Sequence, residues 1–280
     1  MISPQALLQI VQRALDEDLA GGDLTTLYTV SEGALGTAQA VAKESLVCCG
    51  GPVFEQVFHQ VDPAVKVQTL VREGELVRAG TALWSASGSA RSLLMAERTA
   101  LNFVQRLCGI ATLTQHFVQA LPKGSKTRIA DTRKTTPGLR VLERYAVRTG
   151  GGHNHRDNLG SAILIKDNHI AAAGGIEAAL QRARAGAPHT SKIEVEVTNF
   201  DELGRALAGG AEIILLDNFD DAQVAQAVAV IQGRALIEVS GGIKLPRIAA
   251  LAALGVDVIS VGALTHSAPA ADISLDLKLD

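Results

Sequence analysis

The feature that most constrains the fold is a repeated pattern across the second half of the chain. Short apolar runs end in polar residues, and a helical stretch follows each run. The runs are RIADTRKT, AILIKDNH, IEVEVT, IILLDNF, LIEVSGG and VISVGA. One repeat takes roughly 20 to 35 residues, which suits a parallel-strand crossover. The pattern therefore predicts an α/β fold with a parallel sheet.

Repeated βα units can close into a barrel or form an open, doubly wound sheet. No G-x-G-x-x-G follows the first run, and nearly every run ends in polar residues. This favours a C-terminal parallel βα barrel, complete or incomplete, with its site at the carboxyl ends of the strands. The open sheet remains the alternative.

The first part of the chain has a different pattern. Residues 4–19 repeat apolar positions as an amphipathic helix does, segments 38–50 and 65–90 indicate strands and turns, and 92–121 indicate one long or kinked helix containing Gly109. We predict a smaller α+β, sandwich-like domain over 1–115 and the barrel over 116–280. The last residues either complete the barrel or return to the first domain.

Composition excludes several classes of protein. The chain is 47% hydrophobic and 20% charged with a net charge of -3, typical of a globular protein and without the basic field that nucleic acid or a membrane surface would need. Its three cysteines lack C-x-x-C spacing, and no apolar run is long enough to span a bilayer. We expect buried thiols and a cytoplasmic protein.

Polar residues at the strand ends should meet in one barrel mouth. They are Arg133, Lys134, Lys166, Glu196, Asp217, Ser240, Gly241, Gly242, Gly262 and Ala263. Small residues at the last two ends suit phosphate, although glycine also serves tight turns. Glu196 and Asp217 suit ribose hydroxyls or Mg²⁺, or neutralise Lys166 in a structural pair. Pro137 predicts a helix start directed at Arg133 and Lys134.

The segment YAVRTGGGHNHR presents His153, His155 and Arg156 after three glycines. It is interpreted either as a flexible loop over the mouth or as an exposed turn. A zinc site is disfavoured, since such a site expects the histidines at the end of an apolar strand.

The sequence strongly resembles the quinolinate phosphoribosyltransferases, the type II phosphoribosyltransferase family. EDLAGGDLTT, ERTALNFVQRLCGIAT, DTRKTTPGLR, YAVRTGGGHNHR, LIKDNH, EVEV, LLDNF, EVSGGI and VGALTHS occur in the family's order along nearly the whole chain. A related family associated with molybdenum transport shares several of these motifs but differs at LIKDNH.

The resemblance implies transfer of the phosphoribosyl group of phosphoribosyl diphosphate to quinolinate with decarboxylation, which gives nicotinate mononucleotide in de novo NAD biosynthesis. It implies a homodimer or higher assembly in which Arg98 reaches the neighbouring subunit's site, with Mg²⁺ as cofactor. Implied catalytic residues are Lys134, Lys166, Glu196 and Asp217, the two acids holding the metal. The substrate-binding set adds Arg98, Thr132, Arg133, His155, Arg156, Ser240, Gly241, Gly242, Val261, Gly262, Ala263 and His266.

Two rival functions come from other classes. EGELVRAGTALW resembles the turn region of lipoyl and biotinyl carrier domains, but no lysine lies in a suitable turn. A non-catalytic relative would keep the barrel without turnover, and the retained charged motif residues argue against it.

Overall fold

The computed structural model describes residues 2–280 and divides them into two compact units. One unit contains residues 2–115, 135–151 and 264–280, and the other contains 116–134 and 152–263. The units are therefore not continuous in sequence, whereas the sequence pattern places a boundary after residue 115 and leaves open whether the last residues return to the first domain; residues 264–280 cluster with that unit. Residues 135–151, expected in the barrel, cluster with the N-terminal unit.

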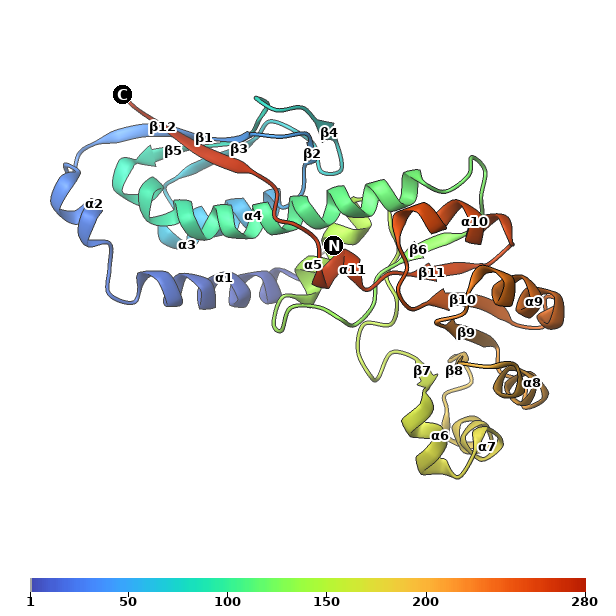
Figure 1. Ribbon diagram of the computed structural model, residues 1–280. Coiled ribbons are helices and arrows are strands. Elements are labelled where there is room, and N and C mark those ends of the chain that lie inside the picture. Colours follow the sequence, from blue (N-terminus) through green and yellow to red (C-terminus); the bar gives the residue numbers. More distant parts are fainter. Residues whose placement is uncertain (1) are drawn as a thin grey trace. The chain divides into compact units, whose positions relative to one another are not determined.

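The N-terminal unit is built on an antiparallel sheet with the strand order β12-β1-β5-β3. These strands are Ile273–Leu279, Leu35–Ala42, Ala82–Ser89 and Lys66–Thr69, and a two-stranded ribbon joins β2 (Leu46–Val47) to β4 (Leu76–Val77). The helices α1 (Pro4–Leu19), α3 (Gly51–Val61) and α4 (Ala90–Gln119) lie on one side of the sheet (Figure 1). The short α2 (Leu24–Thr29) follows α1.

The long helix α4 runs through Gly109 without a break. A Cβ atom at this position would lie 1.9 Å from the backbone oxygen of Pro269. Gly109 is therefore needed for close approach of the returning chain, and it does not end or divide the helix.

The second unit contains a six-stranded parallel sheet with the order β6-β11-β10-β9-β8-β7. The strands are β6 (Arg128–Ala130), β7 (Ile163–Ile165), β8 (Ile193–Val197), β9 (Ile213–Asp217), β10 (Leu236–Ser240) and β11 (Val258–Ser260). Each strand from β7 to β11 neighbours the next, and β6 pairs with β11. This cyclic order belongs to a barrel left open between β6 and β7; a doubly wound sheet reverses its order at a switch point.

Helices follow the strands along the outer side of this row (Figure 1). They are α6 (Asp167–Ala173), α7 (Ile176–Gly186), α8 (Phe200–Ala208), α9 (Asp221–Ile231), the 3-10 turn η1 (Leu245–Arg247) and α10 (Ile248–Ala253). The short α11 (Ala263–His266) follows β11 and clusters with the N-terminal unit from Leu264 on. The strands carry buried apolar side chains that belong to the core, such as Val195, Ile214 and Val239. The predicted α/β fold with an incomplete parallel barrel and a smaller α+β unit is confirmed.

One local expectation was wrong, and one open question received an answer about the backbone. The helix after DTRKTT does not begin at Pro137: α5 spans Arg140–Thr149, because Gly138 adopts φ +83° and puts a turn before the helix. For the segment at His153, where a flexible loop and an exposed turn were both left open, the structure shows a backbone pairing. Its backbone pairs with β6, since the His153 N–H donates to Ile129 O and its carbonyl accepts from Asp131 N–H.

Candidate active site

A cavity of about 380 Å³ lies at the carboxyl ends of the barrel strands. All six strands or the segments directly after them contribute to it, although they are far apart in sequence. Parallel strands place their carboxyl ends at one edge, which explains the convergence. Its lining residues are Thr132, Arg133, Lys134, His155, Arg156, Leu164, Lys166, Glu196, Leu215, Asp217, Glu238, Ser240 and Ser260.

The cavity brings together nine of the residues predicted from sequence, from Thr132 to Ser240. Four lining residues were missed: Leu164, Leu215, Glu238 and Ser260. Glu238 could have been found, because it lies two residues before Ser240 on a strand, and side chains two apart on a strand share a face. The same period links Glu196 to Glu194 on β8.

The wall at β7 and β8 contains an ion pair. Lys166 follows β7, and its Nζ donates to Glu196 Oε2 in a close contact. The Lys166 side chain is 41% exposed and that of Glu196 14%, so the pair lies at the surface of the cavity rather than in the core. Glu196 thus neutralises Lys166 in this structure, as the structural alternative expected.

Asp217 ends β9, and its position depends on the next residue. Asn218 adopts φ +59° and donates from Nδ2 to Asp217 Oδ2 at 2.7 Å, while its backbone N–H donates to Ser240 O. A Cβ atom on Gly241 would lie 2.3 Å from Asn218 Oδ1. Gly241, at φ +90°, therefore makes room for the amide that holds Asp217.

Of the small residues expected around a phosphate, some line the cavity and others do not. Ser240 lines the cavity, and Gly242 has open space where a Cβ atom would lie. The Val261 N–H donates to Ala130 O within the sheet, so this N–H is engaged by the backbone. Gly241, Gly242, Val261, Gly262 and Ala263 are not among the lining residues.

Arg98 and His266 belong to the N-terminal unit and do not line the cavity. Arg98 is an exposed residue of α4, and His266 Nδ1 lies 2.6 Å from Ser267 Oγ.

The segment after His153 is held by a buried carboxylate. Asp131, fully buried after β6, accepts the His155 backbone N–H at 2.7 Å and the Asn154 amide at 2.5 Å. Arg156 donates from Nη1 to Ala162 O at 3.2 Å. Burial and the nearby Arg133 lower the pKa of Arg156, which favours a compensating anion.

His155 faces two buried glutamates. Its Nε2 lies 3.3 Å from Glu238 Oε1 and 3.5 Å from Glu194 Oε2. Burial opposes the charged ring, but hydrogen bonds to Glu194 and Glu238 outweigh it and raise the pKa of His155. Burial and the neighbouring Glu238 also raise the pKa of Glu194, although hydrogen bonding to His155 opposes this.

Two groups of side chains qualify as cation ligands. Glu196 and Asp217 provide carboxylates at the mouth, where Mg²⁺ commonly binds through one or two carboxylates and substrate phosphates. The ligand atoms of His155, Glu194 and Glu238 lie within 4.8 Å of one another deeper in the barrel. The first set fits magnesium chemistry, since its donors are oxygens at a cavity large enough to admit a phosphorylated substrate.

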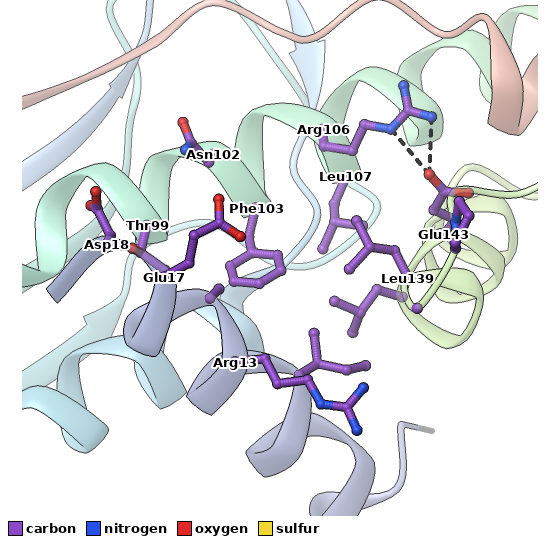
Figure 2. A pocket seen from close by; sticks show the side chains of 15 residues that line it. Arg13, Glu17, Asp18, Thr99, Asn102, Phe103, Arg106, Leu107, Leu139 and Glu143 are labelled. Atoms are coloured by element: carbon purple, nitrogen blue, oxygen red, sulfur yellow. Dashed lines mark hydrogen bonds and ion pairs between the residues drawn. The ribbon is translucent and has the colours of Figure 1, made fainter. Parts of the chain in front are cut away.

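A second cavity, of about 440 Å³, lies within the N-terminal unit between α1, α4 and residues 137–143 (Figure 2). Phe103, Leu107 and Leu139 line its apolar side. Arg106 and the fully buried Glu143 form an ion pair at 2.9 Å along its edge. None of the residues predicted for the site lines this cavity.

The barrel and its charged mouth define a class: enzymes that bind a multiply anionic substrate at the carboxyl ends of βα-barrel strands. The family models of the quinolinate phosphoribosyl transferase N-terminal and C-terminal domains match residues 23–108 and 110–276. The chain belongs to the quinolinate phosphoribosyltransferase family.

Individual relatives agree with this assignment. The chain is 46% identical to the nicotinate-nucleotide pyrophosphorylase [carboxylating] of Mycobacterium leprae, covering 95% of each chain. It is 44% identical to a probable nicotinate-nucleotide pyrophosphorylase [carboxylating] of Synechocystis, covering 95% of this chain and 91% of the relative. The structure of NadC from Streptococcus pyogenes superposes with a TM-score of 0.94 at 41% identity, over 100% of this chain and 99% of that one.

Proposed function

We propose that this protein transfers the phosphoribosyl group of phosphoribosyl diphosphate to quinolinate and releases diphosphate and CO₂, forming nicotinate mononucleotide in de novo NAD biosynthesis. One observation carries the proposal: Arg133, Lys134, Arg156, Lys166, Glu196 and Asp217 line a single cavity. Both substrates are anionic, and their binding needs several cations at one place. The names of the relatives describe the same reaction.

Quinolinate offers two carboxylates to the cations of the cavity. Arg133, Arg156 and Lys166 are suited to them, because planar guanidinium groups bind carboxylates through paired hydrogen bonds and lysine adds a compact charge. Lys134, from the segment after β6, supplies positive charge for the diphosphate. Ser240 and the open space at Gly242 are suited to the 5-phosphate.

The chemistry needs positioning more than a protein base. The ring nitrogen of quinolinate attacks the anomeric carbon as the bond to diphosphate breaks, through a cationic sugar, so catalysis comes from aligning the reactants and stabilising the leaving group. Loss of CO₂ then leaves an electron pair on ring carbon 2, which the adjacent positively charged nitrogen stabilises, and a proton from water completes the C–H bond. Glu196 and Asp217 would hold Mg²⁺, which neutralises charge on the diphosphate.

The assay combines the protein with quinolinate, phosphoribosyl diphosphate and Mg²⁺ and follows CO₂ and nicotinate mononucleotide. We expect both products in equal amounts, and loss of activity when the metal is chelated and restored by added Mg²⁺. Nicotinic acid in place of quinolinate should give little product, because one carboxylate is missing. Binding of both substrates without diphosphate release would instead indicate a non-catalytic relative.

The proposal includes a homodimer or higher assembly in which Arg98 completes the site of a neighbouring subunit. Its support is that Arg98 is exposed and not among the cavity's lining residues. Mixing the inactive variants Arg98→Ala and Arg133→Ala should restore about a quarter of wild-type activity, since half of the mixed dimers' sites are intact and half of the dimers are mixed. No restoration after subunit exchange would exclude a shared site.

No helix among residues 2–280 combines the length and apolar character needed to cross a bilayer. A cytoplasmic location goes with the proposed pathway, and imaging of a fluorescent fusion protein would test it.

A further inference from the structure

Beneath the mouth of the barrel, three ionisable side chains from separate elements meet. Glu194 comes from β8, Glu238 from β10, and His155 from the segment beside β6. Both glutamates are about 4% exposed, and neither the Oε1 atom of Glu194 nor that of Glu238 has a hydrogen-bond partner among residues 2–280, although Glu238 Oε1 lies 3.3 Å from His155 Nε2. Two buried carboxylates are costly unless a proton or cation compensates them. The cluster must therefore hold positive charge or protons.

The orientation of the imidazole identifies the compensating group. The Arg156 backbone N–H donates to His155 Nδ1 at 2.7 Å, and Nε2 points between the two carboxylates. Nδ1 accepts this N–H only through its lone pair, so the ring in this structure is the neutral tautomer with its proton on Nε2; a charged ring would also carry a proton on Nδ1 and could not accept there, although its Nε2 is protonated as well. Nε2 carries a proton in either state.

A metal ion at the same place conflicts with that geometry. The three ligand atoms lie close enough for one cation. Coordination at Nε2 needs a lone pair there, and the other nitrogen would then normally donate its own proton. Here a donor, the Arg156 N–H, faces Nδ1 instead. A proton between the carboxylates is the better account.

The imidazole is part of a series of contacts that leads to Arg156. Asp131 holds the backbone of His155, the two glutamates face its ring, and the ring holds the backbone N–H of Arg156. Arg156 itself lines the cavity. Both ring nitrogens of His155 thus face groups of the protein, although His155, like Arg156, lines the cavity.

We propose that Glu238, together with Glu194, is a positioning residue: the two carboxylates fix the His155 ring, and the ring fixes Arg156 for binding a carboxylate of quinolinate. This inference rests on the proposed function and refines it. His155, expected from the resemblance to bind substrate, acts in the proposal through Arg156.

The test compares Glu238→Leu with Glu238→Gln. Leucine removes the acceptor, whereas glutamine keeps an oxygen of similar position. We expect Glu238→Leu to raise KM for quinolinate about tenfold, the equivalent of one buried hydrogen bond, and to leave KM for phosphoribosyl diphosphate within about twofold. Glu238→Gln should restore KM for quinolinate to within about threefold of wild type.

The matched control is Glu55→Leu, a glutamate of α3 whose side chain is 54% exposed. Its kinetic constants should equal those of wild type. Circular dichroism and thermal unfolding establish that each variant is folded. Should Glu238→Leu not fold, the kinetics of Glu238→Gln and the ¹⁵N NMR spectrum of the wild-type imidazole still test the inference. In wild type, ¹⁵N NMR of the imidazole should show a protonated Nε2.

Several outcomes would overturn the inference. Unchanged quinolinate binding in Glu238→Leu would show that Glu238 does not position Arg156, and tighter binding would show that it repels the substrate. Equal defects in the leucine and glutamine variants would mean that charge, rather than a hydrogen-bond acceptor, is required. A bound metal in wild type that Glu238→Leu loses would establish a metal site. Absence of product from wild type itself would contradict the proposed function instead.

Discussion

The two cavities of this protein have similar volumes and different contents. The barrel cavity, about 380 Å³, receives side chains from six strand ends, and cations and carboxylates lie around one space. The cavity of the N-terminal unit, about 440 Å³, lies between helices and is lined by apolar side chains together with charged ones. The larger of these two cavities is therefore not the one in which cations and carboxylates from separate strands meet.

The difference lies in what the charged groups contact. In the N-terminal cavity, Arg106 bonds to Glu143 and to the backbone oxygens of Thr265 and Ala268, so its guanidinium ties three segments of the unit together. In the barrel cavity, the charged side chains lie together because the strands end there, whether or not these side chains form ion pairs. The volume of a cavity therefore does not identify an active site. Structural and functional charged side chains are distinguished by whether they are bonded to other segments of the fold or are placed at the strand ends.

The largest expected effect is in the barrel cavity. Asp217→Asn should lower kcat/KM by about 10²- to 10³-fold, because it removes a charge near the leaving diphosphate, and should leave the unfolding temperature nearly unchanged. Steady-state kinetics and calorimetry measure both. Asp201→Asn, an 81% exposed side chain on α8, is the control with no expected effect. If Asp217→Asn lowered the unfolding temperature without lowering kcat/KM, Asp217 would be a structural residue, and the difference between the two cavities would not hold.

The next effect is on stability in the N-terminal unit. Glu143→Ala should lower the free energy of unfolding by about 3 kcal/mol, since it leaves Arg106 without its buried partner and removes the acceptor for Thr136. Urea denaturation measures this loss. Glu17→Ala, an exposed residue of the same cavity, should change stability by less than about 0.5 kcal/mol. Equal losses in the two variants would contradict a structural role specific to the ion pair.

A glycine at the barrel mouth should give a smaller effect. Gly241→Ala places a Cβ atom against Asn218 and imposes left-handed strain, so we expect a loss of about 2 kcal/mol and a reduced kcat/KM as Asp217 loses its partner. Gly242→Ala, at φ +57° with open space around it, should cost about 1 kcal/mol from strain alone. Identical behaviour of the two variants would argue against the Asn218 contact.

The smallest effect concerns a helix cap in the N-terminal unit. Asp23 accepts hydrogen bonds from the Thr26 hydroxyl and backbone, which lower its pKa below the usual 3.8. Its ionised form therefore stabilises the fold above that pH, and the contribution disappears as pH falls through the lowered value. Asp23→Ala should cost about 1 kcal/mol at pH 7 and less as the pH falls below 3.8. A difference that is constant with pH would exclude the charged cap.

The barrel and most of its mouth were predictable from sequence, because both follow from short-range patterns. Apolar runs ending in polar residues specify the strands and the edge at which they end. Glu196 and Asp217 were found in this way. Glu194 and Glu238 were missed because they occur inside apolar runs, where only the two-residue period of a strand separates inward from outward side chains.

By itself, the sequence determined the type of the main elements, such as the helix over residues 4–19 and the strands of the barrel, and the chemistry at the strand ends, since periodicity and turn residues act locally. Only the tertiary structure decided that β12 closes the N-terminal sheet, that α5 begins at Arg140 rather than Pro137, and that His155 faces two glutamates. These features depend on contacts between residues distant in the chain. Local patterns carry no information about which distant segment supplies the partner.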